Sequence, residues 1–303
     1  MNASSLQSKA TLGFIVLAVG LIGTSHGAIF ARMADAHPIV TSAMRVGLAA
    51  LVVIPFALWR DYRVFATLKR RPLMLAVGAG VFLAAHFATW IASLDLTSIA
   101  NSVVLVTLNP IWIAFYTMMV TRRLPPGAVA ISIMLAVGGS VIIGYGSAGM
   151  GGGQLTGDIL AVIGGICMSG YLLLGQAARR DLPLLPYVAI CYGVAAIILW
   201  LAVFAMDLPV MGLSLFTYQA FIGMALFSQV LGHSSYNWAL KIFHPGFVAV
   251  FVLGEPILSS AFGFVYFGET IGPWTLGGGV LTLAGIAMGA WAELKPRTNE
   301  QAS

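Results

Sequence analysis

Ten long apolar segments follow one another along this chain, separated by short polar or turn-forming stretches. A helix needs about 20 apolar residues to cross the hydrocarbon core of a bilayer, and each segment reaches that length. We therefore predict ten transmembrane helices and no room for a soluble domain. They are expected at about residues 10–31, 38–59, 72–92, 98–121, 126–146, 156–178, 184–206, 214–238, 244–267 and 273–292.

One pattern occurs twice: a polar residue followed by proline, near the middle of an apolar helix. Asn109-Pro110 lies within residues 98–123, and Glu255-Pro256 lies within residues 244–269. Aligning the two prolines also pairs Val104 with Val250, Val106 with Val252 and Ile111 with Ile257. The pattern predicts two copies of a five-helix unit, residues 1–148 and 149–303.

An odd number of helices per copy determines how the two copies are related. Five crossings bring the chain out on the opposite face of the membrane, so the second copy must be inverted relative to the first. Inverted repeats can exchange inward-open and outward-open states about an axis in the membrane plane. The helix count therefore predicts an all-α membrane protein that works by alternating access.

Composition and charge support a multi-pass membrane protein and orient it. The chain is 59% hydrophobic and only 8% charged, whereas charged residues make up about a quarter of ordinary soluble domains. With the amino terminus inside, thirteen of the fifteen Lys and Arg residues fall on inner segments, and the others are Arg32 and Arg45. Basic residues favour the cytoplasmic side, so we predict that both termini are cytoplasmic. The net charge of +5 is thus a topology signal and does not indicate nucleic-acid binding.

Polar and aromatic residues within the helices are the candidates for substrate contacts. Gln229, His233 and Asn237 recur at every fourth position and share one helix face, and His86 and Trp90 are spaced in the same way. Such residues either form hydrogen bonds between helices or line a cavity. We predict that these five, together with Trp112 and Tyr171, contact a small-molecule substrate.

Two charged residues lie deep within the predicted helices, Arg45 and Glu255. A charge at the bilayer centre costs at least about 2.5–3.5 kcal/mol, so each must be paired, neutralised or hydrated. Glu255 is a candidate for proton coupling, or it hydrogen-bonds the Val252 carbonyl that Pro256 leaves without its N–H partner. Asn109 is equivalent to Glu255 and has the same structural alternative. Pro110 and Pro256 are predicted to act as hinge or packing residues.

The sequence predicts neither a cofactor nor a metal site. Its two cysteines lie in apolar segments, and it contains no phosphate-binding loop of the type that binds ATP. Transport would therefore be driven by a gradient or would be facilitated diffusion. The expected partners are a small-molecule substrate and membrane lipid, with no nucleic acid, and the oligomeric state is left open.

The residues quoted above resemble one transporter family over nearly the whole chain. The stretch from His86 to Pro110, the segment 228–241 and the Glu255-Pro256 segment are similar to the EamA-type branch of the drug/metabolite transporter superfamily. The resemblance implies a ten-helix, inverted-repeat carrier in the bacterial inner membrane that exports small metabolites. Aromatic amino acid exporters are the nearest functional comparison, so amino acids, aromatic or otherwise neutral, are the expected substrates. Drugs, nucleobases and other metabolites are alternatives.

The sequence fits two other classes of function, an intramembrane enzyme and a channel, less well. An intramembrane enzyme would use His86 or His233 with a serine, but adjacent helical residues such as His233 and Ser234 do not face each other. The match to Gly-x-Ser-x-Gly at residues 23–27 lies inside the apolar segment 10–31 and cannot form the strand-to-helix elbow that exposes a nucleophile, and no His-Glu-x-x-His motif is present. A channel would need a continuous polar pore lining, which the sparse polar positions do not provide. The sequence therefore favours a carrier that is not an enzyme.

Overall fold

The computed structural model describes residues 3–97, 99–147, 155–268 and 270–294, and this part of the chain is helical with connecting turns and no strand. Ten of its segments are long and apolar enough to cross a membrane, from Lys9–Met33 to Pro273–Leu294. The predicted ten-helix membrane fold is confirmed. The predicted boundary between the copies, at residues 148 and 149, lies outside the described residues.

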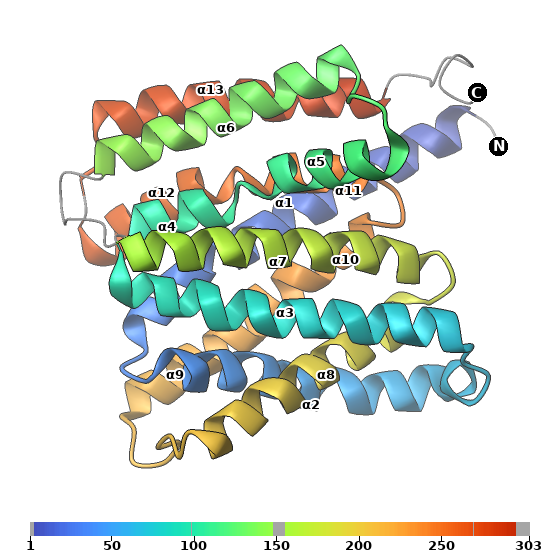
Figure 1. Cartoon of the computed structure of the whole chain (residues 1–303), viewed down its shortest axis with the longest axis vertical. Helices are drawn as coiled ribbons and strands as arrows, with labels where there is room; N and C mark the ends of the chain where they lie inside the picture. Colours follow the sequence, from blue (N-terminus) through green and yellow to red (C-terminus); the bar gives the residue numbers. More distant parts are fainter. Residues whose placement is uncertain (1–2, 98, 148–154, 269, 295–303) are drawn as a thin grey trace.

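The first five crossings contain six helices, because the fourth crossing is divided (Figure 1). The helices are α1 (Ala3–Met33), α2 (Pro38–Ala66), α3 (Arg70–Leu96), α4 (Ile99–Val106), α5 (Asn109–Thr121) and α6 (Gly127–Ser147). Crossings six and seven are single helices, α7 (Leu155–Arg179) and α8 (Leu184–Ala205). The eighth crossing joins α9 (Leu215–Gly223), the π-helix η2 (Met224–His233) and α10 (Ser234–Ala239). The last two crossings are α11 (Pro245–Val252) with α12 (Glu255–Phe267), and α13 (Pro273–Leu294).

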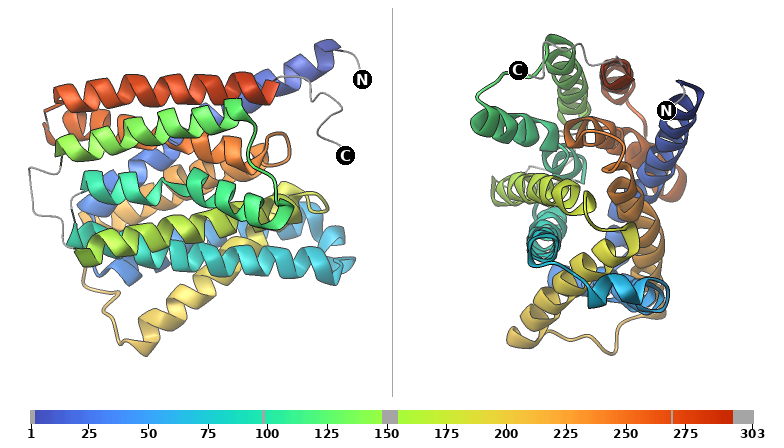
Figure 2. Two further views of the ribbon diagram at one scale, coloured as in Figure 1. Left: turned by 45° about the horizontal axis from the view of Figure 1, so that its top comes forward. Right: turned by 90° about the vertical axis from the view of Figure 1, so that its right-hand side faces the viewer.

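The helices of the two halves pack in a reciprocal arrangement, and one such pair, α6 and α13, can be followed in Figure 2. Helix α3 runs along α7, and their counterparts in the other half, η2 with α10 and α1, also run along each other. Helices α2 and α8 pair, as do α6 and α13. A two-fold relation between two five-helix units requires this reciprocal pairing. It places the first four crossings of each unit around a shared centre.

Proline divides the fourth crossing of each unit. Pro110 and Pro256 occupy the first turns of α5 and α12, where the missing N–H of proline is tolerated. The preceding helices end at Val106 and Val252, so two residues without helical assignment separate each pair of helices. The predicted interruption of both copies within the membrane is therefore present in the structure.

Helices α6 and α13 form a close pair at one side of the bundle, visible along the top of Figure 1. A Cβ atom on Gly278 would lie 2.5 Å from the carbonyl oxygen of Gly139, and one on Gly285 would lie 2.5 Å from the backbone nitrogen of Ala136. The Ser132 hydroxyl donates to the Gly285 carbonyl at 2.9 Å. Small residues allow this backbone approach, so the fifth helices of the two units pack directly on each other.

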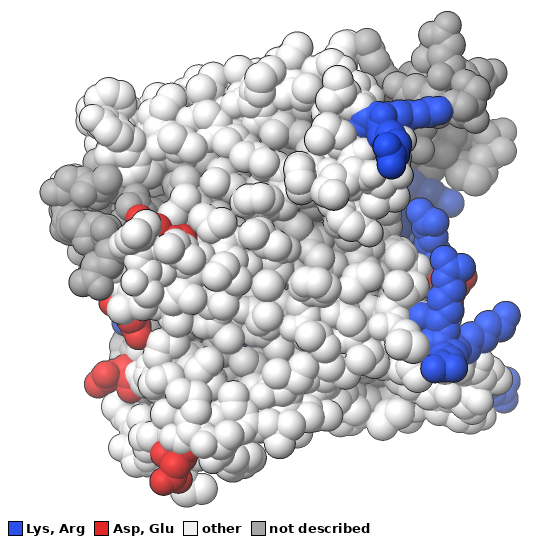
Figure 3. Space-filling view, in the orientation of Figure 1, with Lys and Arg blue, Asp and Glu red and all other residues white. Residues whose placement is uncertain are grey.

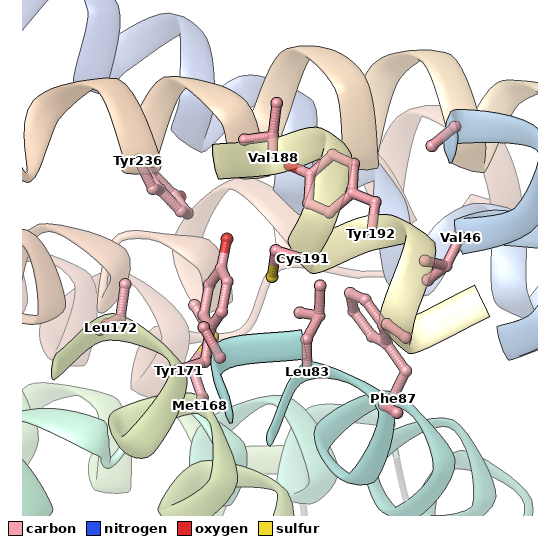
Figure 4. Close-up of a cluster of buried hydrophobic side chains, with 14 of the residues drawn as sticks. Val46, Leu83, Phe87, Met168, Tyr171, Leu172, Val188, Cys191, Tyr192 and Tyr236 are labelled. Carbon is pink, nitrogen blue, oxygen red and sulfur yellow. The ribbon is translucent and has the colours of Figure 1, made fainter. Parts of the chain in front are cut away.

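The interior between α3, α7 and α8 is filled by large buried side chains (Figure 4). Leu83 and Phe87 from α3 meet Tyr171 from α7 and Tyr192 from α8. At the surface, Lys and Arg gather at the end of the bundle where α1 begins and α13 ends, and most of the Asp and Glu visible in this view lie at the opposite end (Figure 3). The charges thus lie at the ends of the apolar crossings.

Candidate functional site

A small cavity lies where the two divided crossings face the centre of the bundle. Its volume is about 20 Å³, which is room for about one water molecule. A larger substrate therefore needs the surrounding helices to move apart. The lining residues are Thr24, Arg45, His86, Trp90, Val106, Thr107, Asn109, Met168, His233, Val252 and Glu255.

Aromatic rings form one wall of this cavity. His86 and Trp90, one turn apart on α3, are stacked with ring centroids 5.9 Å apart and planes at 6°. The His233 ring on η2 lies 6.2 Å from His86 and 5.3 Å from Phe87. The Nδ1 atom of His86 is 2.9 Å from the Gly164 carbonyl oxygen, which fixes the orientation of the ring. This wall offers flat apolar surface with polar ring edges.

Arg45 brings a positive charge to the cavity from α2. Its side chain is 1% exposed, and its Nε atom donates a hydrogen bond to Oε1 of Gln229 at 2.9 Å. The guanidinium carbon lies 4.1 Å from the centre of the Phe87 ring, a cation–π distance. The cation is therefore held by one neutral amide and the face of an aromatic ring.

Glu255, at the start of α12, is the only carboxylate among the described residues that line the cavity. The Tyr236 hydroxyl donates to its Oε1 atom at 3.2 Å. The same hydroxyl is 2.8 Å from the hydroxyl of Thr24 on α1. These contacts join α1, α10 and α12 and fix the position of one carboxylate oxygen.

Several polar atoms around the cavity have no hydrogen-bond partner within the described part of the chain. They are Nη1 of Arg45, Nε1 of Trp90, both amide atoms of Asn109, and Nδ1 of His233. An unsatisfied buried polar group costs roughly 1–3 kcal/mol, so a concentration of them marks a place for a polar ligand or for water. The Asn109 amide therefore donates no hydrogen bond to the Val106 carbonyl, which was the structural role that the sequence allowed for it.

The two divided crossings place partial positive charge at the cavity. Helices α5 and α12 both begin at the cavity, with Asn109 and Glu255 as their first residues. The amino terminus of a helix carries a partial positive charge, and discontinuous membrane helices direct such ends at substrate groups. Both units thus direct equivalent backbone groups to the same centre.

The structure brings together some of the residues predicted from the sequence and separates others. The cavity is lined by His86, Trp90, His233 and Glu255. Gln229 does not line it but accepts a hydrogen bond from Arg45, which does. The amide nitrogen of Asn237 instead donates to the Tyr171 hydroxyl at 2.5 Å.

Tyr171, Asn237 and Trp112 are not among the residues that line this cavity, and their role as substrate contacts stays a prediction. The shared face expected for Gln229, His233 and Asn237 assumed a regular α-helix, whereas η2 is a π-helix. Single π-helical turns are frequent at functional sites.

Arg45, Thr24, Thr107 and Asn109 line the cavity but were not predicted to contact substrate. Arg45 carried a signal in the sequence, because it is the one basic residue deep inside a predicted helix. Such a residue is a functional candidate by default. The two threonines carried no comparable signal, since threonine is common at helix–helix contacts in membranes.

The serines that follow His233 contact other groups. The hydroxyl of Ser234 lies 3.0 Å from that of Tyr192, and the hydroxyl of Ser235 donates to the Leu231 carbonyl at 2.7 Å. A nucleophile and its base need a mutual hydrogen bond, and neither serine makes one with His233 here. No group of three or more His, Cys, Asp or Glu with metal-binding geometry occurs among the described residues.

Comparison with known proteins identifies the family. The model of the EamA-like transporter family matches residues 11–145 and again residues 155–290. This chain belongs to the EamA-like transporter family. Each match covers one five-helix unit, so the family relationship extends over both halves and makes the protein a multi-pass membrane transporter.

Individual relatives agree with this EamA-like assignment. An uncharacterized transporter of Archaeoglobus fulgidus is 23% identical over 289 residues, covering 92% of this chain and 95% of that protein. A solved crystal structure superimposes with a TM-score of 0.77 at 17% identity, covering 94% of this chain and 98% of the other. This structural similarity shows that the two proteins share a fold over nearly their whole length.

Proposed function

We propose that this EamA-like transporter exports small amphipathic metabolites, with amino acids, aromatic or otherwise neutral, as its main substrates. The central cavity is the binding site, and alternating access moves the substrate through it. The cell membrane of a bacterium, the inner membrane where there are two, is the proposed location. Transport is either driven by an ion gradient or facilitated.

The observation that carries this proposal is the composition of the cavity. Aromatic faces from His86, Trp90 and His233 lie beside a buried cation, Arg45, and a buried carboxylate, Glu255. Unpartnered polar atoms of the described residues point to a ligand that supplies hydrogen bonds. A neutral amino acid combines an apolar side chain with two charged groups and is complementary to this surface.

The proposed orientation in the membrane rests on the charge distribution. Lys and Arg gather at the end of the bundle where α1 begins and α13 ends (Figure 3). Basic residues are retained on the cytoplasmic side, so this end faces the cytoplasm. Addition of a membrane-impermeant amine-reactive label to intact cells tests this orientation: Lys69 and Lys241 should remain unlabelled until the cells are permeabilised.

Counterflow in proteoliposomes tests the function itself. Vesicles loaded with unlabelled amino acids should accumulate the same labelled amino acid transiently, and vesicles without protein should not. A parallel set of nucleobases and cationic drugs should give little accumulation. If drugs or nucleobases exchange and no amino acid does, the proposed substrate class is wrong, whereas flux that never saturates would indicate a channel.

An imposed pH gradient distinguishes coupled from facilitated transport. Glu255 is the carboxylate that lines the cavity, and we propose it as the proton-carrying group if transport is coupled. The gradient should then accelerate transport by the wild type and not by Glu255→Gln. A wild-type rate that is independent of the pH gradient would exclude proton coupling.

A further inference from the structure

We propose that Arg45 binds the carboxylate of the transported molecule and that Glu255, on the same cavity, binds its ammonium group. The inference rests on the proposed function and narrows it to a stated recognition: the site requires both charges of an α-amino acid. Neither half of such a molecule, an amine or a carboxylate alone, would satisfy it.

The Arg45 side chain is arranged to receive an anion. Nε is occupied by Gln229, which fixes the plane of the guanidinium, while Nη1 has no partner among the described residues. Arginine presents its donors as a rigid planar fork that matches a carboxylate. A ligand carboxylate at Nη1 would thus meet a donor already held in position.

A glycine on α1 leaves room beside this donor. A Cβ atom at Gly27 would lie 3.3 Å from Nη1 of Arg45 and 3.4 Å from Cη2 of Trp90. Contacts of that length are tighter than ordinary van der Waals contacts, so a side chain at position 27 would crowd the free face of the guanidinium. The backbone of α1 therefore approaches the site without covering Nη1.

The cavity holds one buried charge of each sign, Arg45 and Glu255, which attract each other across it. The hydrogen-bonding partner of Arg45 Nε is a neutral amide, and that of Glu255 is the Tyr236 hydroxyl. Buried charges are most stable when each has a direct, hydrogen-bonded partner of opposite sign. A zwitterion placed between them would give each buried charge such a partner and leave the net charge of the cavity unchanged.

Arg45 has a competing explanation, because its bond to Gln229 also joins α2 to η2. A purely structural role predicts equal losses of affinity for every ligand once Arg45 is changed. A recognition role predicts a loss confined to ligands that carry a carboxylate. Affinity measured over matched ligands therefore separates the two.

The experiment measures binding of three matched compounds to the purified full chain by isothermal titration calorimetry. Phenylalanine carries both charges, phenethylamine lacks the carboxylate, and 3-phenylpropionate lacks the amine. Leucine, isoamylamine and 4-methylpentanoate form an aliphatic set. The wild type should bind at least one amino acid about tenfold or more tighter than either of its halves, which is the effect of one charge-assisted hydrogen bond.

Two substitutions should produce opposite changes. Arg45→Gln should lower the affinity for the amino acid and for the carboxylate about tenfold or more and leave the amine unchanged, since it removes only the cationic fork. Glu255→Gln should lower the affinity for the amino acid and the amine and leave the carboxylate unchanged. Equal losses for all three ligands in Arg45→Gln would overturn the assignment.

Arg179→Gln provides the matched control. This second buried arginine is 3% exposed, but its Nε and Nη1 atoms donate to the backbone carbonyls of Asn237 and Leu182, away from the cavity lining. Its loss should lower the melting temperature and leave ligand preference unchanged. If Arg179→Gln shifts the preference as strongly as Arg45→Gln, the effect does not belong to the cavity.

Gly27→Ala keeps the test decisive if Arg45→Gln does not fold. It retains the arginine but crowds Nη1, so the affinities for the amino acid and the carboxylate should fall while that for the amine stays unchanged. Unchanged affinity for all three would contradict the placement of the carboxylate. A wild type that binds no compound of either set would instead contradict the proposed function, because the failure precedes any substitution.

Discussion

The two divided crossings have the same backbone form and different chemistry. Helices α5 and α12 are each 13 residues long, begin with a polar residue before proline, and begin at the cavity. Glu255 accepts a hydrogen bond from Tyr236, whereas the Asn109 amide is unpartnered within the described chain. The duplicated backbone therefore gives two equivalent helix breaks that face the cavity, residues 107–108 and 253–254, which we call the two openings. One difference in sequence, asparagine against glutamate, makes only the second opening acidic.

Packing at the two openings also differs. At the break in the first unit, a glycine on α7 of the second unit allows close approach: a Cβ at Gly165 would lie 2.9 Å from the Val106 carbonyl oxygen. In the second unit the glycine lies in the opening itself, since a Cβ at Gly254 would lie 2.7 Å from Cδ2 of Leu21. One glycine faces rigid backbone and the other faces a flexible side chain. The first opening is thus more tightly constrained.

The largest expected effect concerns the acidic residue. Glu255→Gln should lower the initial rate of amino acid export roughly tenfold to a hundredfold, the equivalent of one hydrogen bond to a charged group. Asn109→Ala should lower the rate less, roughly threefold to tenfold, since a neutral amide contributes a weaker hydrogen bond to the ligand than a charged group does. Counterflow rates in proteoliposomes measure both. Equal losses would show that the two openings are chemically equivalent.

The packing difference predicts unequal losses of stability. Gly165→Ala should lower the free energy of unfolding by about 1–3 kcal/mol, because overpacking against fixed backbone forces the helices apart. Gly254→Ala should cost less, since the Leu21 side chain can rotate away. Thermal unfolding of both variants in the same detergent compares them. A larger loss in Gly254→Ala would reverse the ranking of the two openings.

The smallest effect is expected at the far ends of the same helices. Helix α5 is capped by Arg122 at φ 55°, and α12 by Gly268 at φ 69°. A left-handed conformation costs a residue with a side chain about 1–2 kcal/mol, so Arg122→Gly should raise the melting temperature slightly. Gly268→Ala should lower it. If Arg122→Gly is destabilising, the side chain has a role that outweighs the backbone strain.

The fold was predictable because its determinants are local. A crossing needs only enough consecutive apolar residues, and proline at position 110 or 256 interrupts a helix whatever surrounds it. His86 and Trp90 could be paired for the same reason, because residues one turn apart on α3 share a face. The repeated polar–proline pattern and the helix count predicted two units, and the family model matches the chain twice, over residues 11–145 and 155–290.

The site was less predictable because it depends on contacts between distant segments. Arg45 and Gln229 are 184 residues apart in sequence, and nothing local indicates their bond. The π-helix η2 changes which side chains share a face, so Asn237 reaches Tyr171 while His233 reaches the cavity. Threonines such as Thr107 gain importance only from the helix break beside them.

The most direct test of the central claim is substrate protection at both openings at once. Thr107→Cys and Val252→Cys, each in a Cys167→Ser, Cys191→Ala background, place a thiol on opposite sides of the cavity, and Ser140→Cys places one in a buried position away from its lining. A transported amino acid should slow alkylation by a membrane-permeant maleimide at the first two positions, saturably, and leave the third unchanged. Unaltered alkylation at both openings, while the same amino acid is transported, would contradict a binding site between the two breaks.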